Sequence, residues 1–91
     1  MITEDFKPEG IRALNKFYKR LEGVAVELPS LVEQEKAKDI IEKILPPDEG
    51  EVNMDYVRRV LIALKYVETH FPDSMLDDIK AGKEINISEY K

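Results

Sequence analysis

Apolar residues recur at intervals of three and four along most of the chain, which is the spacing of one face of an α-helix. Four segments carry this pattern, and each is bounded by residues typical of a helix end. They are residues 8–22, 29–45, 53–71 and 73–81. We therefore predict an all-α protein, a small four-helix bundle that forms one domain over residues 1–91.

Prolines and capping residues set the ends of these segments. Pro8 suits the first turn of a helix, because its missing N–H and fixed φ cost nothing there. Ser30 followed by Glu33 has the spacing of a capping box at the start of the second segment. Pro46 and Pro47 cannot continue a helix. They therefore open a loop that separates the second segment from the third.

The third segment is apolar around most of its circumference. Its main stripe consists of Val57, Val60, Leu61, Leu64, Val67 and Phe71. Ile62 and Tyr66 lie on the other side of the same helix. A helix of this kind is expected in the middle of a bundle. We therefore expect the third helix to be central and the fourth to be a short helix beside it.

Two stretches alternate with a period of two instead. Residues 24–28 are an extended linker, an edge strand or the lead-in to the second helix. Residues 84–88 are typical of an extended C-terminal tail. The isoleucines of the tail could pair with the valines of the first stretch, but two short strands alone are marginally stable in water. We therefore favour an extended tail without that pairing.

Charge and composition say little about the fold, but they exclude several classes of functional site. The chain has 91 residues, no cysteine, one histidine and a formal net charge of −5. The excess lies in residues 27–51, which carry three bases and eight acids, whereas residues 1–26 carry five bases and four acids. The lack of cysteine excludes disulfides, thiolate nucleophiles and cysteine zinc sites. Four scattered glycines exclude a phosphate-binding glycine loop.

No segment resembles a membrane span or a signal peptide. The longest apolar run, residues 60–64, is far shorter than the roughly 20 residues that cross a bilayer. The first five residues contain two acids and no base, so they lack the basic and then apolar pattern of a signal peptide. Together with the lack of cysteine, this predicts a cytoplasmic protein with no membrane partner.

His70 is the residue that most suggests chemistry, because it is the one histidine. Glu68 and Asp73 are close to it in sequence and could complete a metal site. A histidine at a helix C-terminus is more simply explained by its interaction with the last carbonyl groups. Acidic residues elsewhere lie in a loop or a first helical turn, where they are ordinary. We therefore predict no catalytic residue, no metal and no cofactor, and hence no enzyme.

The third and fourth segments meet at a short corner, as in a helix-turn-helix. The second helix of that motif would then carry Asp73, Asp77 and Asp78. These carboxylates would repel phosphate, whereas recognition helices usually present basic or amide side chains. The sequence therefore argues against a standard DNA-binding motif.

Protein–protein interaction is the favoured function, through a protein partner or self-association into a homodimer. A small domain can enclose only part of its aliphatic residues, and the remainder can form a binding surface. The candidates for partner binding lie on the far side of the third helix and in the termini: Ile62, Tyr66, Phe6, Ile85 and Ile87. The alternative is that the other helices cover the third helix and the termini pack over its ends.

A nucleic-acid-associated function is the second hypothesis. It would use a basic face made by the first and third helices: Arg12, Lys16, Lys19, Arg20, Arg58 and Arg59. The string of basic and aromatic residues at 16–20 resembles surfaces that bind phosphates and stack bases. A plain solvated helix face is the simpler interpretation, since the net charge of the chain is negative.

Overall fold

A computed structural model describes residues 2–46, 52–84 and 88 of the chain. Its elements are four α-helices and one 3-10 turn: α1 (Pro8–Phe17), η1 (Tyr18–Leu21), α2 (Leu31–Ile44), α3 (Met54–His70) and α4 (Asp73–Lys80). The described part contains no strand. The predicted all-α class with four helices is therefore confirmed, and the main difference is that the first helix tightens into η1 for its last turn.

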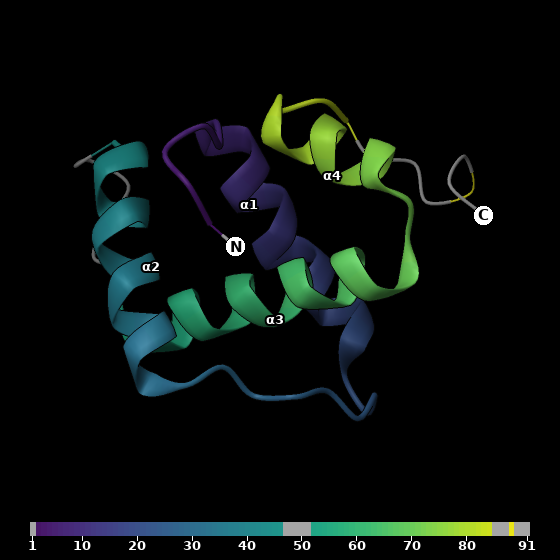
Figure 1. The fold of residues 1–91 in the computed structure, drawn as a ribbon, viewed down its shortest axis with the longest axis horizontal. Helices are drawn as coiled ribbons and strands as arrows, with labels where there is room; N and C mark the ends of the chain where they lie inside the picture. The colour runs from purple at the N-terminus through teal and green to yellow at the C-terminus, as the bar shows by residue number, and fades with distance from the viewer. Residues whose placement is uncertain (1, 47–51, 85–87, 89–91) are drawn as a thin grey trace.

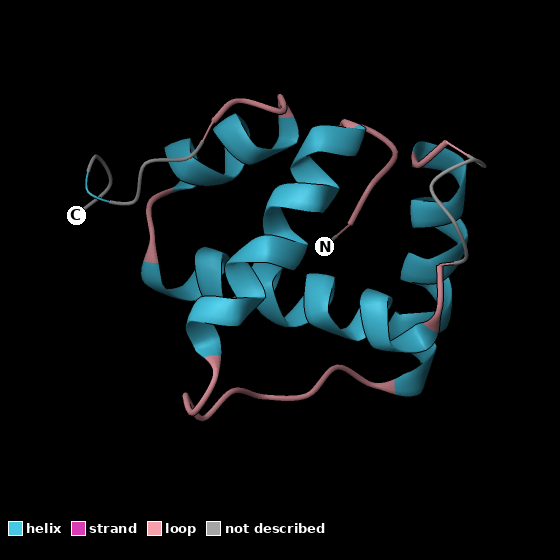
Figure 2. Ribbon diagram, turned by 180° about the vertical axis from the view of Figure 1, so that it is seen from behind, coloured by secondary structure: helices cyan, strands magenta, loops and turns pink. Residues whose placement is uncertain are grey.

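The helices are arranged around α3. Each of α1, α2 and α4 packs against α3, and α1 also packs against α4. Figure 1 shows α2 standing at one end of the molecule, with α1 between it and α4. The N-terminal segment, residues 2–7, passes between α1 and α2, as both views show (Figures 1 and 2). The central position predicted for the third helix is confirmed.

Side-chain caps fix the starts of α2 and α3. The Ser30 hydroxyl accepts a hydrogen bond from the Glu33 N–H at 3.2 Å. The Asn53 side-chain oxygen accepts one from the Tyr56 N–H at 2.9 Å. Each cap satisfies one of the N–H groups that a helix leaves unpaired in its first turn. The sequence signals at these two starts therefore act through local hydrogen bonds.

The core draws side chains from all parts of the described chain. Every helix contributes, and so do the N-terminal segment and η1: Ile2, Phe6, Ile11, Leu14, Leu21, Ala37, Ile41, Leu45, Val57, Val60, Ile62, Ala63, Leu64, Val67, Met75 and Ile79 are buried. The N-terminal residues fill the space between α1 and α2, where no helix lies. The N-terminal segment therefore packs into the core together with the four helices.

Gly10 allows α1 to approach α4 closely. A Cβ atom at this position would lie 2.2 Å from the carbonyl oxygen of Ile79, well inside van der Waals contact. Because that oxygen belongs to the backbone of α4, a larger side chain would force the two helices apart. The glycine is therefore required by packing rather than by its φ angle.

Residues 24–30 form an extended linker that runs along α3 on the side away from α4 (Figure 2). Of the three interpretations of this stretch, the linker is correct. The Lys65 side chain of α3 donates a hydrogen bond to the Glu27 carboxylate at 2.9 Å and ties the linker down. The predicted extended tail and its pairing with the linker involve residues 85–87, which lie outside the described residues.

Candidate interaction surfaces

The residues predicted to bind a partner are largely part of the core. Ile62 is 3 % exposed and Phe6 is 2 % exposed, so neither is available to a partner in the monomer. Ala25 and Val26 of the linker lie beside Ile62, and Phe6 fills the space next to α1. These two residues therefore belong to the core of the monomer, and their role in partner binding stays a prediction.

Tyr66, Ile85 and Ile87 complete that predicted set. Tyr66 is partly buried, and its ring lies 4.3 Å from the His70 ring and 6.0 Å from the Phe17 ring, measured between centroids. It is therefore one member of an aromatic cluster at the end of α3 rather than a free side chain. Ile85 and Ile87 lie outside the described residues.

The exposed apolar side chains lie instead at the start of α2. Leu28, Leu31 and Val32 are 68 %, 70 % and 59 % exposed, which is far above the core residues. The spacing along α2 contains a signal for this. Val32 precedes the buried Ile41 by nine residues, or two and a half turns, so it lies outside the buried stripe of the helix. A prediction based only on the main stripe does not include this cluster.

Val32 also borders a hollow of about 350 Å³ between α2, α3 and the linker. Its walls are mainly apolar: Ile2, Pro29, Val32, Ala37, Ile40, Leu61 and Leu64. Its rim carries charges of both signs: Glu27, Glu33, Lys36, Lys65 and Glu68. The hydrogen bond that Lys65 donates to Glu27 raises the pKa of the Lys65 ammonium group above its ordinary value. We call the hollow, together with Leu28 and Leu31, the α2–α3 surface.

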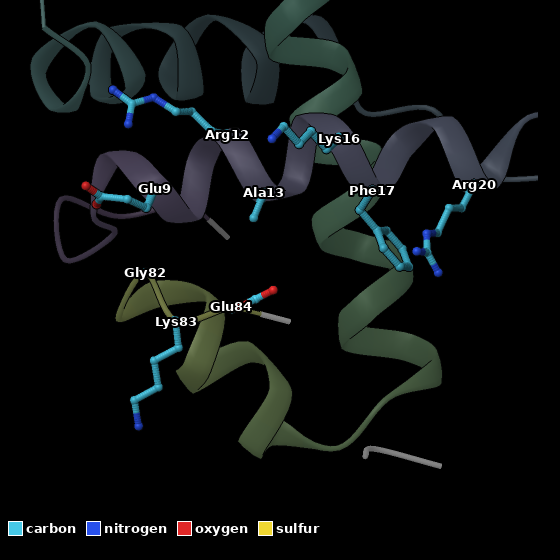
Figure 3. A pocket seen from close by; sticks show the side chains of 9 residues that line it. All are labelled: Glu9, Arg12, Ala13, Lys16, Phe17, Arg20, Gly82, Lys83 and Glu84. Carbon is cyan, nitrogen blue, oxygen red and sulfur yellow. The ribbon is translucent and has the colours of Figure 1, made fainter. Parts of the chain in front are cut away.

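A second hollow, of about 500 Å³, lies between α1 and the segment after α4 (Figure 3). Arg12, Lys16 and Arg20 line it from α1 and η1, and Lys83 and Glu84 line it from the segment after α4. Ala13 and Phe17 point from α1 towards that segment (Figure 3). We call this hollow the α1 groove.

The α1 groove contains half of the predicted basic face. Arg12, Lys16 and Arg20 lie in it, whereas Lys19 is exposed but does not line it. Arg58 makes an ion pair with Asp55 within α3. The Nε of Arg59 donates to the Asp55 carbonyl oxygen at 3.3 Å. Both arginines of α3 therefore interact with Asp55 at its N-terminal turn, and a single face formed by all six residues stays a prediction.

His70 is the last residue of α3, as predicted, and it is exposed. Its ring contacts Tyr66. Within the described ranges, no group of three histidine, cysteine or acidic side chains lies close enough together to hold a metal ion. In the same ranges, no helix combines the length and apolar character that crossing a membrane needs.

The chain was compared with known protein families, with curated proteins and with solved structures, and no match was found. A functional argument for this four-helix fold therefore rests on its own surfaces.

Proposed function

We propose that this protein is a small, non-catalytic protein–protein interaction module of the cytoplasm, and that it binds a second copy of itself. The observation that carries the proposal is the exposure of Leu28, Leu31 and Val32 beside an apolar hollow. The absence of cysteine supports the compartment.

The exposed side chains supply a driving force for association. Removing apolar surface from water contributes about 25 cal/mol per Å², and a fully buried leucine or valine contributes about 1.5–3 kcal/mol. Single exposed leucines are common on protein surfaces, but large apolar groups gathered in one place are typical of interaction sites. Leu28, Leu31 and Val32 lie within five consecutive residues around the start of one helix. Their burial against a partner would therefore be favourable.

The hollow supplies a place for such side chains. At about 350 Å³, it lies at the lower end of the range for binding pockets, which is about 300–1,000 Å³. Its apolar lining comes from four separate parts of the chain, the N-terminal segment, the linker, α2 and α3. Protruding apolar groups and an apolar recess thus occur on the same side of α2, with Val32 belonging to both.

A second copy fits this surface because the surface is complementary to itself. In a dimer with two-fold symmetry the same patch lies on both subunits, so each copy can place its protruding side chains against the hollow of the other. The rim supports this arrangement. A rim of one sign would repel its own copy, whereas Lys36 and Lys65 can face the rim glutamates of the partner.

Sedimentation velocity over a range of protein concentrations tests the proposal. We expect the wild-type chain to shift from monomer to dimer, and Val32→Glu to weaken the dimer by at least about tenfold, because it brings a charge into an apolar contact. Val24→Glu is the matched control, since Val24 is also exposed and does not line the hollow. It should leave dimerisation unchanged.

Two outcomes would overturn the proposal. One is a wild-type chain that stays monomeric at the highest soluble concentration, which would leave the surface to a different protein. The other is an equal effect of Val32→Glu and Val24→Glu, which would place the dimer contact elsewhere. Far-UV circular dichroism of each variant shows whether the helices are intact.

A further inference from the structure

We infer that the α1 groove binds single-stranded nucleic acid through a row of cations on α1 and η1. This inference is independent of the proposed dimer, because the α1 groove and the hollow of the α2–α3 surface share no lining residue.

The first argument is the spacing of the cations. Arg12, Lys16 and Arg20 follow one another at intervals of four residues along α1 and its continuation η1. Four residues of α-helix advance by about 6 Å, which is the interval between Arg12 and Lys16 along α1. Arg20 follows in the tighter turn η1 and points, with Phe17, to the opposite side of α1 from Arg12 (Figure 3). These three cations, the α1 row, stand out in a chain whose formal net charge is −5. They give the molecule a local basic surface despite its acidic total.

The second argument is the regular charge of a nucleic-acid backbone. Each nucleotide carries one phosphate, and a strand in a stacked duplex advances by about 3.4 Å per nucleotide. A strand that is partly unstacked is longer per nucleotide and so comes closer to the spacing of the row. An acidic peptide has no fixed interval between its charges. Arg12 and Lys16 therefore fit two neighbouring phosphates of a single strand better than they fit scattered carboxylates, and Arg20 can meet a further phosphate beside Phe17.

The third argument is the aromatic side chain in the groove. Phe17 lines the groove between Lys16 and Arg20, and its ring is partly exposed. The rings of Tyr66 and Phe71 hold it at centroid distances of 6.0 and 6.2 Å. A fixed aromatic side chain beside a row of cations is the arrangement that single-strand binders use, because bases stack on the ring while phosphates meet the cations.

Carboxylates limit the extent of the site. Glu9 and Glu84 also line the groove, and Lys83 lies 3.7 Å from Asp78. A polyanion is therefore expected along the α1 edge and not across the groove. With about three phosphate contacts, binding should be weak and strongly dependent on salt.

The experiment is fluorescence anisotropy of a labelled 12-nucleotide oligo(dT) with the full chain at several salt concentrations. We expect binding at low salt, and a plot of log affinity against log salt with a slope of about −2, since each single-strand phosphate contributes about −0.7. Lys16→Glu should reduce the affinity at least about fivefold and make the slope shallower by about 0.7. Phe17→Leu, which keeps an apolar side chain in the cluster, should reduce the affinity at least about fivefold through lost stacking.

Lys43→Glu on α2 is the matched control, because it changes the total charge equally at an exposed position outside the groove. It should alter the affinity by less than about twofold. A polyglutamate peptide of the same charge should compete poorly with the oligonucleotide. No binding at low salt, an equal effect of the two lysine variants, or equal competition by polyglutamate would each overturn the inference. Sedimentation of Lys16→Glu separates this site from the dimer, since that variant should dimerise normally.

Discussion

The two sides of the molecule use apolar residues in different ways. On one side, α1 and α4 pack against α3 and against each other, and residues such as Leu14, Val67 and Met75 are completely covered. On the other side, α2 packs mainly against α3, and it buries Ala37 and Ile41 while Leu31 and Val32 remain exposed. Apolar side chains are therefore more fully covered on the side of α1 and α4 than on the side of α2.

This difference shows that apolar content does not locate a binding surface; coverage by other segments does. Ile62 lies on the far side of α3, where the linker covers it. Val32 lies at the edge of the hollow between α2 and α3 and is 59 % exposed. Both proposals, dimerisation and nucleic-acid binding, are therefore based on surfaces that the other segments leave exposed, the α2–α3 surface and the α1 groove.

The largest effect is expected when the same truncation is made on both sides. Ile62→Ala should lower the free energy of unfolding by about 2–4 kcal/mol, because it leaves a cavity in the core. Leu31→Ala should change it by less than about 0.5 kcal/mol in the monomer, because its side chain is largely in water already. Urea denaturation of dilute protein, followed by circular dichroism, measures both. Equal losses would show that the two sides are equally packed.

Adding a methyl group tests the close packing of α1 against α4. Gly10→Ala should cost about 1–3 kcal/mol, since the new Cβ would meet the Ile79 carbonyl oxygen at 2.2 Å and the helices must separate. Gly23→Ala is the control at a site with open space but a φ of +83°, and it should cost about 1 kcal/mol from backbone strain alone. Thermal denaturation compares them. A Gly10 variant no less stable than the Gly23 variant would contradict this close approach.

The helix caps provide a smaller and more local contrast. Asn53→Ala should lower the free energy of unfolding by about 1 kcal/mol, because it weakens the first turn of the central helix. Ser30→Ala should cost about half as much, since the exposed first turn of α2 can fray without opening the core. Hydrogen exchange should show the Ser30 effect confined to the first turn of α2. A global loss of protection in that variant would show that α2 unfolds together with α3.

The smallest effect is expected from Tyr56, a partly buried residue of α3 that makes the free energy of unfolding depend on pH. Burial raises the pKa of the Tyr56 phenol above its ordinary value of 10.0, against the lowering influence of Arg12 and Arg59. The phenol therefore ionises first in the unfolded chain. The stability that it contributes is complete below pH 10 and declines as the pH rises from there through the folded pKa.

A comparison with Tyr56→Phe isolates this contribution. The wild-type chain should lose more stability than the variant between pH 9 and pH 11, as measured by urea midpoints. The raised pKa of Lys65 acts in the same direction, but it is present in both proteins and cancels in the difference. Identical declines in the two proteins would show that Tyr56 is solvated in the folded state.

Features that depend on neighbours along the chain could be predicted from the sequence alone. The helix starts at Ser30 and Asn53 follow from hydrogen bonds that span three residues. The central role of α3 follows from its broad apolar surface, which has to be covered wherever the other helices lie. The basic face predicted from the sequence places Arg12 and Lys16 together on the first helix, since residues four apart on one helix share a face.

The accessibility of the remaining apolar and basic residues depends on the tertiary structure and could not be predicted from the sequence. Ile62 and Phe6 are buried because the linker and the N-terminal segment pass over α3 and beside α1, and the paths of such irregular segments depend on contacts between residues distant in sequence. The positions of Arg58 and Arg59 relative to α1 also depend on the tertiary structure. Hydrogen bonding to Asp55 and the packing of α3 on α1 set their positions, and neither can be calculated from the spacing within one helix.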